Sequence, residues 1–562
     1  MTNSDILEVI EMTGKIMELH EGDPNRIRSY QNVGFSLGKV LEPFSTLSDA
    51  DLLRLQGVGK GLLSAIREIE NTGTLQELQD LLAQTPEGLL DLFKIKGLGV
   101  KKIKVLWKEL GLDNLNDLQI ACENGLIATV KGFGTKTQES ILASLAFLQS
   151  QAGKLRMNKG HELAQDILDA LRPTFPSIQV VGEVVQGDET IQLIQCVIPT
   201  EDRTPLVIAH PLFSADEAAC APFTWRGGVN SHQVQVEIQK VSLQESVGKI
   251  MALNSKVPHL QKKIEGQSLQ EILYKQPHLT SEESYYQALG SAWIAPEMRE
   301  GRNEFEWAKT NSPTDLVTWE SLKGALHNHS TYSDGRHSLQ EMASFAESLG
   351  WEYFGIADHS QTAAYANGLP AERVMQQWEE IDHWNAQAGK IQILKGIESD
   401  ILVDGSLDYP DEILMGFDYV VASVHQTLSM DIVKATHRLI KAISHPATSI
   451  LGHPTGRLLL SRNGYPIDHM EVIKACAAHG VIMELNASPY RLDLDWRWIE
   501  ACVEQGVMIS INPDAHEQEG FFDMKYGVMV ARKAGLTFQN TFNAQSLSFV
   551  ENHFKAKRGR HT

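Results

Sequence analysis

Seven short apolar runs recur between residues 324 and 516, and ionisable side chains stand near the downstream end of each run. The runs occupy residues 324–329, 353–359, 391–398, 419–425, 449–453, 481–486 and 508–516. Each has the length and composition of a buried strand, whereas residues 339–349 and 467–479 have the periodicity of amphipathic helices. Alternating strands and helices predict a parallel sheet. In a parallel barrel the strand ends converge on one face, so these side chains should meet in one pocket.

The residue types in this predicted pocket indicate a metal site. His327 and His329 are two positions apart, a spacing that points both rings to the same side of a strand. Imidazoles together with carboxylates suit Zn, Mn or Fe, and Mg remains possible. A single histidine at a strand end is more often packed or hydrogen-bonded than bound to metal. Six histidines accompanied by three carboxylates favour metal binding.

The N-terminal region repeats one short phrase three times: Gly57-Val-Gly59-Lys60, Gly97-Leu-Gly99-Val100 and Gly132-Phe-Gly134-Thr135. In each copy an apolar residue and Gly-x-Gly precede a helical pattern, which is typical of a helix-hairpin-helix motif. The glycines permit a tight turn, and amides at the start of the next helix can bind a DNA phosphate. A plain turn between helices is the alternative. Three copies with basic residues nearby favour DNA contact by Gly57, Gly59, Lys60, Gly97, Gly99, Lys101, Gly132, Gly134 and Lys136.

The C-terminal motifs resemble the ligand set of a PHP (polymerase and histidinol phosphatase) domain, a distorted seven-stranded α/β barrel with up to three metals. The motifs are His327-x-His329, Ser333-Asp334-Gly335, Asp358-His359, Gly396-Ile-Glu398, Ser423-Val-His425, Gly452-His453-Pro454 and Asp514-Ala-His516. The resemblance implies one metal on His327, His329, Glu398 and Asp514. It implies a second on Glu398, His425 and His453, and a third on Asp334, His359 and His516.

Phosphoester hydrolysis is the chemistry that this constellation predicts. Clustered divalent cations hold phosphate oxygens, lower the pKa of a bound water and neutralise the leaving oxygen. Asp358 precedes a ligand, so we expect it to orient the His359 ring rather than bind metal. Arg457 is a candidate clamp for a substrate phosphate, and a surface arginine near the rim is its equally weighted alternative.

Other segments resemble family X DNA polymerases, and in particular the bacterial members that end in a PHP domain. Asn25-Arg-Ile-Arg28-Ser-Tyr30 is similar to their small N-terminal domain, and Tyr286-Gln-Ala-Leu-Gly290 with residues 294–300 is similar to their thumb-to-PHP junction. The fold expected is multidomain α/β. Its parts are a lyase-like helical domain (1–85) with the first hairpin, a fingers-like domain (86–150) with the other two, a degenerate α+β palm and thumb (151–310), a linker (311–322), the PHP barrel (323–555) and a basic tail (556–562).

The palm departs from the family pattern, which has a Gly-Ser turn, an Asp-x-Asp pair and a third Asp that together serve two Mg ions. When the chain is aligned through Glu189-Thr190, Gly182-Glu183 stands where the family has Gly-Ser, and Leu193-Ile-Gln195 stands where it has Asp-x-Asp. Glu237 stands at the position of the third Asp. Leucine offers no oxygen and glutamine no charge, while a glutamate beside the triphosphate adds repulsion. We therefore expect nucleotide transfer to be lost.

Composition sets outer bounds on location and partners. A chain of 562 residues accommodates three or four domains, and its net charge of −21 argues against indiscriminate coating of DNA. Five cysteines without paired spacing favour a reducing bacterial cytoplasm. The chain begins without a signal-peptide pattern and contains no apolar stretch of membrane-spanning length. We expect a monomer without a membrane partner.

These observations predict a metal-dependent DNA phosphodiesterase with two or three divalent ions, acting in DNA repair. Its expected activity is 3′-to-5′ exonuclease, with abasic-site cleavage as an extension, on gapped, nicked or single-stranded ends. A DNA-binding scaffold with structural metals is the first alternative. A small-molecule phosphatase of the histidinol-phosphatase type is the second, but it leaves three hairpin repeats unexplained. An active polymerase is disfavoured by the palm.

Overall fold

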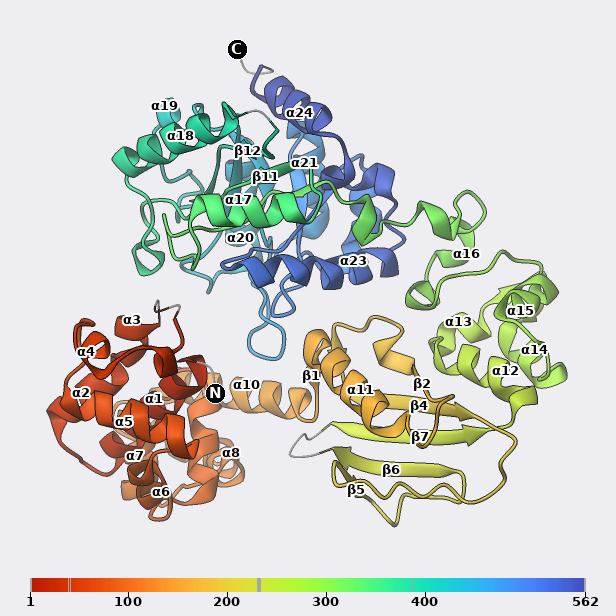
Figure 1. The fold of residues 1–562 in the computed structure, drawn as a ribbon, viewed down its shortest axis with the longest axis horizontal. Coiled ribbons are helices and arrows are strands. Elements are labelled where there is room, and N and C mark those ends of the chain that lie inside the picture. The colour runs from red at the N-terminus through yellow and green to blue at the C-terminus, as the bar shows by residue number, and fades with distance from the viewer. Residues whose placement is uncertain (1–2, 39, 41, 230–233, 388, 560–562) are drawn as a thin grey trace. The chain divides into compact units, whose positions relative to one another are not determined.

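The computed structural model describes residues 3–38, 40, 42–229, 234–387 and 389–559 of the chain, which divides into two compact units, Met1–Ala152 and Gly153–Thr562. Figure 1 colours the chain from red to blue along its length. Among the described residues, no helix combines the length and apolar character needed to cross a lipid bilayer. The five cysteines are free thiols.

The first unit is helical. Its helices are α1 (Asn3–Leu19), α2 (Pro24–Gln31), α3 (Val33–Leu37), α4 (Asp49–Leu52), α5 (Lys60–Thr72), α6 (Gln76–Leu82), α7 (Val100–Leu110), α8 (Leu115–Glu123), α9 (Leu126–Thr129) and α10 (Gly134–Gln151), with 3-10 turns η1 (Phe44–Thr46) and η2 (Glu87–Lys94). Helix α1 packs against α2, α5, α6 and α7, and Ile10, Ile66 and Leu106 are fully buried in the shared core. This core fixes the hairpins at its surface.

The first two glycine repeats have the same backbone geometry. Gly57 and Gly97 both have a φ of +85°, a left-handed conformation that glycine adopts without steric cost, and Gly59 and Gly99 cap the N-termini of α5 and α7. A Cβ added to Gly59, Gly97 or Gly99 would meet nothing within 4 Å. These glycines therefore keep the backbone open to approach from outside.

The third repeat has the same Gly-x-Gly pattern as the first two, but its backbone has a different conformation. Gly132 and Gly134 both have positive φ, at +89° and +71°, and Phe133 occupies the cap position before α10. The Nζ atom of Lys102 lies 5.6 Å from the Phe133 ring centroid, which connects the second and third hairpins. The second and third repeats are therefore in contact.

The second unit begins with a five-stranded sheet in the order β2-β4-β7-β6-β5, in which β4 and β7 are parallel and the other pairs antiparallel. Its elements are β1 (Leu155–Arg156), α11 (Met157–Leu171), β2 (Gln179–Val181), η3 (Gly182–Val184), β3 (Thr190–Ile191), β4 (Leu193–Pro199), β5 (Phe213–Ala215), β6 (Thr224–Val229), β7 (Gln235–Val241) and α12 (Leu243–Leu253). Helix α11 packs on β2, β3 and η3. We call this segment the palm.

A small helical segment follows the palm. It contains α13 (Val257–Gln261), the hairpin β8 (Lys263–Ile264) and β9 (Gln267–Ser268), α14 (Leu269–Lys275), α15 (Glu282–Leu289), η4 (Pro296–Met298) and α16 (Glu304–Trp307). A buried polar trio holds it together: His259 Nδ1 lies 2.7 Å from Glu304 Oε1, and His259 Nε2 lies 2.8 Å from the Tyr286 hydroxyl. We call this segment the thumb.

The barrel contains the seven predicted apolar runs, and the third run is split into two strands. The strands are β10 (Gly324–Ala325), β11 (Tyr353–Gly355), β12 (Gln392–Leu394), β13 (Gly396–Asp400), β14 (Tyr419–Ser423), β15 (Thr448–Leu451), β16 (Ile482–Asn486) and β17 (Ile509–Asn512). They form two parallel sheets, β10-β11-β12 and β13-β14-β15-β16-β17. Parallel bridges from His359 to Glu398 and from Asn328 to Ala515 join the two sheets at the strand ends.

Helices cover the outside of these sheets, as the upper part of Figure 1 shows. They are α17 (Leu339–Ser348), α18 (Ala371–Asn385), α19 (Asp411–Leu414), α20 (Ile432–Ile443), α21 (His469–His479), α22 (Ile499–Glu504), α23 (Met524–Lys533) and α24 (Leu547–Gly559). The predicted helices 339–349 and 467–479 correspond to α17 and α21. Residues 556–559 of the predicted basic tail belong to α24, where Lys557 is buried, and residues 560–562 lie outside the described residues.

Candidate metal centre

The nine predicted ligands converge at the carboxyl ends of the barrel strands. His327, His329 and Asp334 follow β10, His359 follows β11, Glu398 lies in β13, His425 follows β14, His453 follows β15, and Asp514 and His516 follow β17. Their ligand atoms form four overlapping groups, each within 4.8 Å: His329, Asp334, His359 and His516; His327, His453 and Asp514; His327, His329 and Glu398; and His359, Glu398 and His425. The parallel topology therefore gathers residues from the whole barrel at one place.

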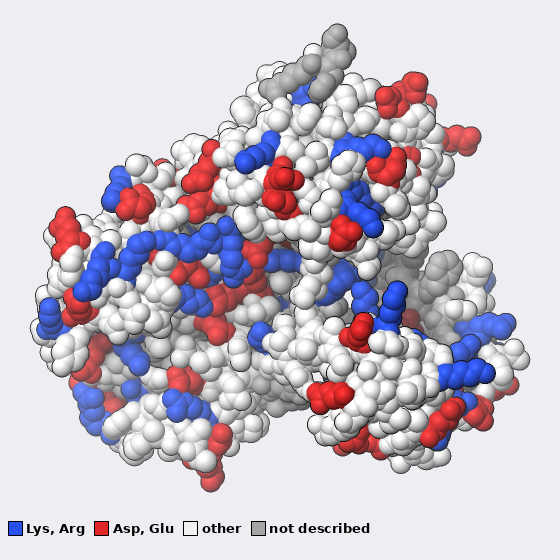
Figure 2. All heavy atoms as spheres, turned by 180° about the vertical axis from the view of Figure 1, so that it is seen from behind, with Lys and Arg blue, Asp and Glu red and all other residues white. Residues whose placement is uncertain are grey.

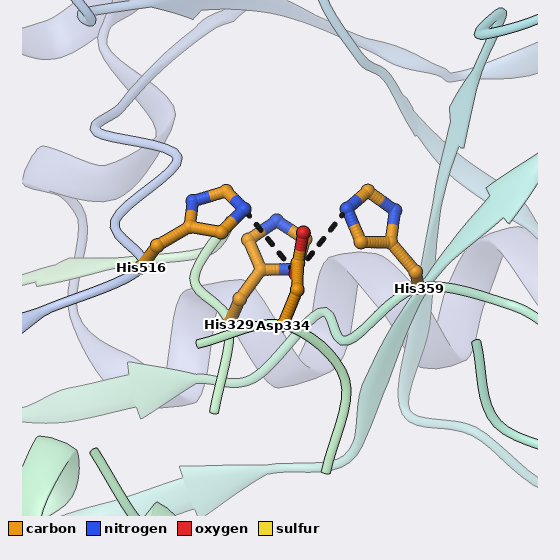
Figure 3. Close-up of side chains that lie close together, drawn as sticks. All are labelled: His329, Asp334, His359 and His516. Atoms are coloured by element: carbon orange, nitrogen blue, oxygen red, sulfur yellow. Dashed lines mark ion pairs between the residues drawn. The ribbon is translucent and has the colours of Figure 1, made fainter. Parts of the chain in front are cut away.

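Figure 3 shows the outermost of these groups, in which Asp334 lies between two imidazoles. Asp334 Oδ1 is 3.4 Å from His516 Nε2 and 3.6 Å from His359 Nε2. The His329 ring stacks on both neighbours, with centroids 4.2 Å from His516 and 4.4 Å from His359. Three histidines and one carboxylate thus face one another across a small gap.

Glu398 is the hub of the deeper groups. Its Oε1 lies 2.9 Å from His453 Nε2 and 3.2 Å from His425 Nε2. The same Oε1 is 3.3 Å from His327 Nε2, and Oε2 is 2.9 Å from His359 Nδ1. Burial disfavours its charge, but His425 and the other imidazoles hold the pKa of Glu398 well below its usual range. The hub is therefore an anion.

Several buried atoms of the cluster make no hydrogen bond to any residue that the structure describes, although some of them approach one another as ion pairs. They include His327 Nε2, His359 Nδ1 and Glu398 Oε2, all of which face the centre. Buried polar atoms are normally paired, so an unpaired set of nitrogen and oxygen ligands fits divalent cations. The residues present therefore suit the divalent metals that the sequence predicts.

Two buried carboxylates that the sequence reading missed support the ligands. Glu484 lies 2.7 Å from His327 Nδ1 and accepts a 2.7 Å hydrogen bond from the His453 amide. Asp400 contacts His425 Nδ1. Carboxylates on the far nitrogen of a ligating histidine fix its tautomer and raise its basicity. Glu484 lies inside the apolar run 481–486, two positions before the polar Asn486. On a strand this spacing puts both side chains on one face, and it is the signal in the sequence that points to Glu484.

The two candidate catalytic residues have contacts other than those expected. Asp358 is buried and accepts hydrogen bonds from Ser330 N (2.7 Å), Ser333 Oγ (2.5 Å) and Gln377 Nε2 (2.6 Å). It therefore fixes the loop that carries Asp334. No hydrogen bond between Asp358 and the His359 ring occurs in the part of the chain that the structure describes.

Arg457 points into the protein rather than over the cluster. Its guanidinium pairs with Glu189 of the palm and with Asp495, at 2.9 Å, and contacts the carbonyl oxygens of Arg491 (2.9 Å) and Leu492. The side chain is 14% exposed, so its donors are committed to internal partners. This arrangement ties the palm to the loop after β16.

Arg491, in that loop, is the cation that lies beside the cluster, and sequence reasoning did not select it. Its Nε atom is 3.6 Å from Asp514 Oδ2. Burial together with this nearby charge lowers the pKa of His453. The short motif Ser-Pro-Tyr-Arg491 after Asn486 carries no pattern that would mark it in advance.

Comparison with known proteins places this site in a family. A helix-hairpin-helix domain family matches residues 1–75, and the PHP domain family matches residues 325–488. The chain is 34% identical to the "DNA polymerase/3'-5' exonuclease PolX" of Bacillus subtilis (strain 168), over 99% of this chain and all of the relative. The chain belongs to the bacterial PolX family. The resemblance to family X polymerases with a C-terminal PHP domain is thereby confirmed, as is the multidomain α/β fold.

Further relatives match about a third of the chain. A "Probable phosphatase" of Thermoanaerobacter sp. (strain X514) is 30% identical over 30% of this chain and 70% of its own length. One from Acetivibrio thermocellus is 28% identical over 36% of this chain and 84% of its own length. The PolX chain therefore contains a PHP domain of the metal-dependent phosphoesterase class, as predicted.

The palm of this PolX chain pairs its polar atoms with one another. Gln195 and Glu237 are direct partners in the β4–β7 register, and Glu237 Oε1 accepts hydrogen bonds from Gln195 Nε2 (2.9 Å) and Gln239 Nε2 (2.6 Å). Glu237 Oε2 accepts from Arg226 Nε at 2.7 Å. The guanidinium thus supplies the positive charge that balances Glu237. Among the described residues, groups able to hold a metal occur only in the barrel.

The remaining palm positions are also internally occupied. Glu183 Oε2 accepts hydrogen bonds from the amides of Gln192 (2.6 Å) and Leu193 (3.1 Å), so its carboxylate closes onto the start of β4. Asp188, which precedes Glu189, pairs with Lys256 (2.6 Å) and with Lys533 of α23 (2.8 Å). Asp188 and Glu189 therefore join the palm to the barrel.

The predicted DNA-contacting residues of the hairpins, listed above, are all exposed on the first unit. On the face seen in Figure 2, Lys and Arg form one longer row at the left of the view and otherwise lie scattered among Asp and Glu. In a protein with a net negative charge, contact with DNA phosphates is limited to such local basic groups.

Proposed function

We propose that this PolX chain is a metal-dependent DNA phosphodiesterase that removes nucleotides from 3′ ends. It works on gapped, nicked or single-stranded DNA in repair, with abasic sites as a further substrate, and its polymerase activity is lost. The observation that carries the proposal is the convergence of nine ligand side chains around buried atoms without partners. The exonuclease part of the Bacillus subtilis relative's name supports it.

Each part of the chain has a role in this proposal. Two or three divalent ions on the nine ligands would supply Lewis-acid charge and acidify a bound water. Glu398 provides the shared anionic oxygen between the inner groups, while Glu484 and Asp400 orient the histidines. The hairpin glycines offer amides to backbone phosphates without reading sequence.

A small-molecule phosphatase is the second candidate, favoured by the relatives named as probable phosphatases, which match about a third of this chain. It assigns no task to the hairpins of the first unit. A scaffold with structural metals is less well supported, because the unpaired ligand atoms lie at the strand ends rather than within the apolar core.

Digestion of end-labelled DNA tests the proposal. With Mn, a 5′-labelled single strand should give a ladder of progressively shorter products, and a 3′-labelled strand should release labelled mononucleotide. EDTA should stop both reactions. Purified chain that hydrolyses small phosphomonoesters but leaves both DNA substrates intact would favour the phosphatase instead.

A further inference from the structure

Two side chains at the rim of the metal centre are not used by the ligand cluster. Arg491 lies 3.6 Å from Asp514 Oδ2 and is 21% exposed. Its guanidinium makes no hydrogen bond to any residue that the structure describes. An arginine beside a metal cluster, with free donors, has the fork geometry that matches two oxygens of a phosphate.

The backbone of Arg491 is nevertheless held firmly. Arg457 Nε donates to its carbonyl oxygen at 2.9 Å, and its amide donates to the Ser488 carbonyl at 2.7 Å. The fixed backbone places the base of the side chain beside the cluster, so only the side chain itself is ordered when an anion arrives. Arg457 differs, because four hydrogen bonds hold its guanidinium to internal partners.

Tyr365 lies on the rim, with its ring close to the rings of two ligands. It belongs to η7 (Ala364–Ala366), is 64% exposed, and its ring centroid is 6.1 Å from that of His359 and 6.3 Å from that of His425. In the described part of the chain its hydroxyl has no hydrogen-bond partner. Exposed aromatic rings next to a phosphate site are platforms on which unpaired nucleobases stack.

We propose that Arg491 and Tyr365 form a subsite for the terminal nucleotide of a single-stranded DNA end. Arg491 binds non-bridging oxygens of the terminal phosphodiester, and Tyr365 stacks on the unpaired base. This inference rests on the proposed nuclease function and adds its preferred substrate. A base within a blunt duplex cannot offer its face to Tyr365, so unpaired 3′ ends are removed faster than paired ones.

The two residues have separable effects, which makes the subsite testable. Arg491 would serve any phosphoester, whereas Tyr365 serves only substrates with a base. The substrates are a 5′-labelled oligothymidylate and methyl p-nitrophenyl phosphate, a diester without a nucleobase. The variants are Arg491→Ala, Arg491→Lys, Tyr365→Ala and Tyr365→Phe. Arg203→Ala and Tyr274→Ala, at exposed positions of the palm and thumb, are the matched controls.

Tyr365→Ala should raise KM for the oligonucleotide roughly tenfold with little change in kcat, and should leave the small diester unaffected. Tyr365→Phe should restore the wild-type KM, because it keeps the ring. Arg491→Ala should slow hydrolysis of both substrates at least about tenfold, and Arg491→Lys should recover only part of it. Metal content, measured by mass spectrometry, should be unchanged in all four variants.

A readout without turnover completes the test. With Ca²⁺ in place of Mn, 2-aminopurine at the 3′ terminus should lose fluorescence on binding to wild type and Tyr365→Phe, but not to Tyr365→Ala. If wild type degrades DNA while Tyr365→Ala and Arg491→Ala match their controls, this inference is wrong and the nuclease proposal stands. If wild type degrades no DNA, the nuclease proposal itself fails.

Discussion

The barrel and the palm both bring polar side chains together on neighbouring parallel strands, but they satisfy them differently. In the barrel, Glu398 and its surrounding imidazoles leave buried nitrogens and oxygens without hydrogen-bond partners. In the palm, Glu237 accepts hydrogen bonds on both oxygens, and Arg226 balances its charge. The first arrangement is completed by a cation from outside, whereas the second is complete within the protein.

The barrel cluster therefore has the features of a ligand-binding site, whereas the polar groups of the palm already bind one another. An unpaired buried polar group costs free energy that folding has to offset elsewhere, so such groups persist where a ligand satisfies them. In the palm this cost is absent, because Gln195 and Arg226 donate hydrogen bonds to Glu237. Glu189 of the palm also forms an ion pair with Arg457 of the barrel, which joins the two segments.

The largest effect should follow loss of a barrel ligand. His329→Ala or Asp514→Asn should reduce Mn-dependent DNA degradation by at least about a hundredfold, because ligand loss exceeds the effect of removing a group that merely supports a ligand. Gel assays of labelled DNA measure this effect, with Arg203→Ala as control. Full activity in both variants would contradict the ligand assignment.

Asp188→Asn tests the connection between palm and barrel. The change leaves Lys533, which is 2% exposed, with less compensating charge and should lower the free energy of unfolding of the second unit by about 2 kcal/mol at pH 7. Burial opposes the charge of Asp188, but Lys533 and Lys256 lower its pKa. A lowered pKa stabilises the fold above the unfolded value of about 3.9 and loses that contribution as pH falls through the folded value.

Denaturant titrations at several pH values measure this effect. The difference between wild type and Asp188→Asn should be full near neutral pH and should shrink on acidification below about pH 4. A difference that does not change with pH would mean that the carboxylate charge is not what stabilises the junction.

Arg226→Ala tests whether the polar site of the palm contributes to nuclease activity. Glu237 would lose its guanidinium, and we expect a loss of about 1 kcal/mol in stability, because Arg226 is 47% exposed and partly screened by solvent. Nuclease activity should stay within about twofold of wild type. A large fall in nuclease activity with intact folding would assign the palm a part in the chemistry.

The smallest effect is expected at the hairpins. Replacing Gly97 and Gly99 by alanine should weaken DNA binding several-fold and spare hydrolysis of methyl p-nitrophenyl phosphate. The left-handed φ of Gly97 disfavours alanine, whereas Gly99 has extended φ and open space. Gly73→Ala, at a helix C-cap of the same unit, is a control for the backbone strain alone. Equal loss on both substrates would indicate a folding role.

Much of the barrel was predictable because its signals are local. His327 and His329 stand two positions apart at the polar end of a run of strand length. These features are enough to predict that both rings lie on one side of a strand end, without knowledge of the rest of the chain. Arg457 shows the limit of such signals. Its partner Glu189 lies 268 positions away, and nothing near either residue indicates that they meet. Glu484 was missed for a related reason, since a carboxylate in an apolar strand gains meaning only from the histidines on neighbouring strands.

The third hairpin shows a second limit. Gly132-Phe-Gly134 has the letters of the other repeats, yet its second glycine has a positive φ and begins α10 instead of capping it. Residue spacing predicted three equal motifs. Backbone conformation shows that the first two motifs share one shape and that the third has a different one.

The central claim is that the barrel performs chemistry and the palm performs none. A 5′-labelled primer on gapped DNA, incubated with Mn and all four nucleotides, tests both parts in one lane when wild type and Asp514→Asn are compared. Wild type should shorten the primer, and Asp514→Asn should leave its length unchanged. Template-dependent lengthening of the primer by Asp514→Asn would contradict the account, because it would reveal a working polymerase site in the palm.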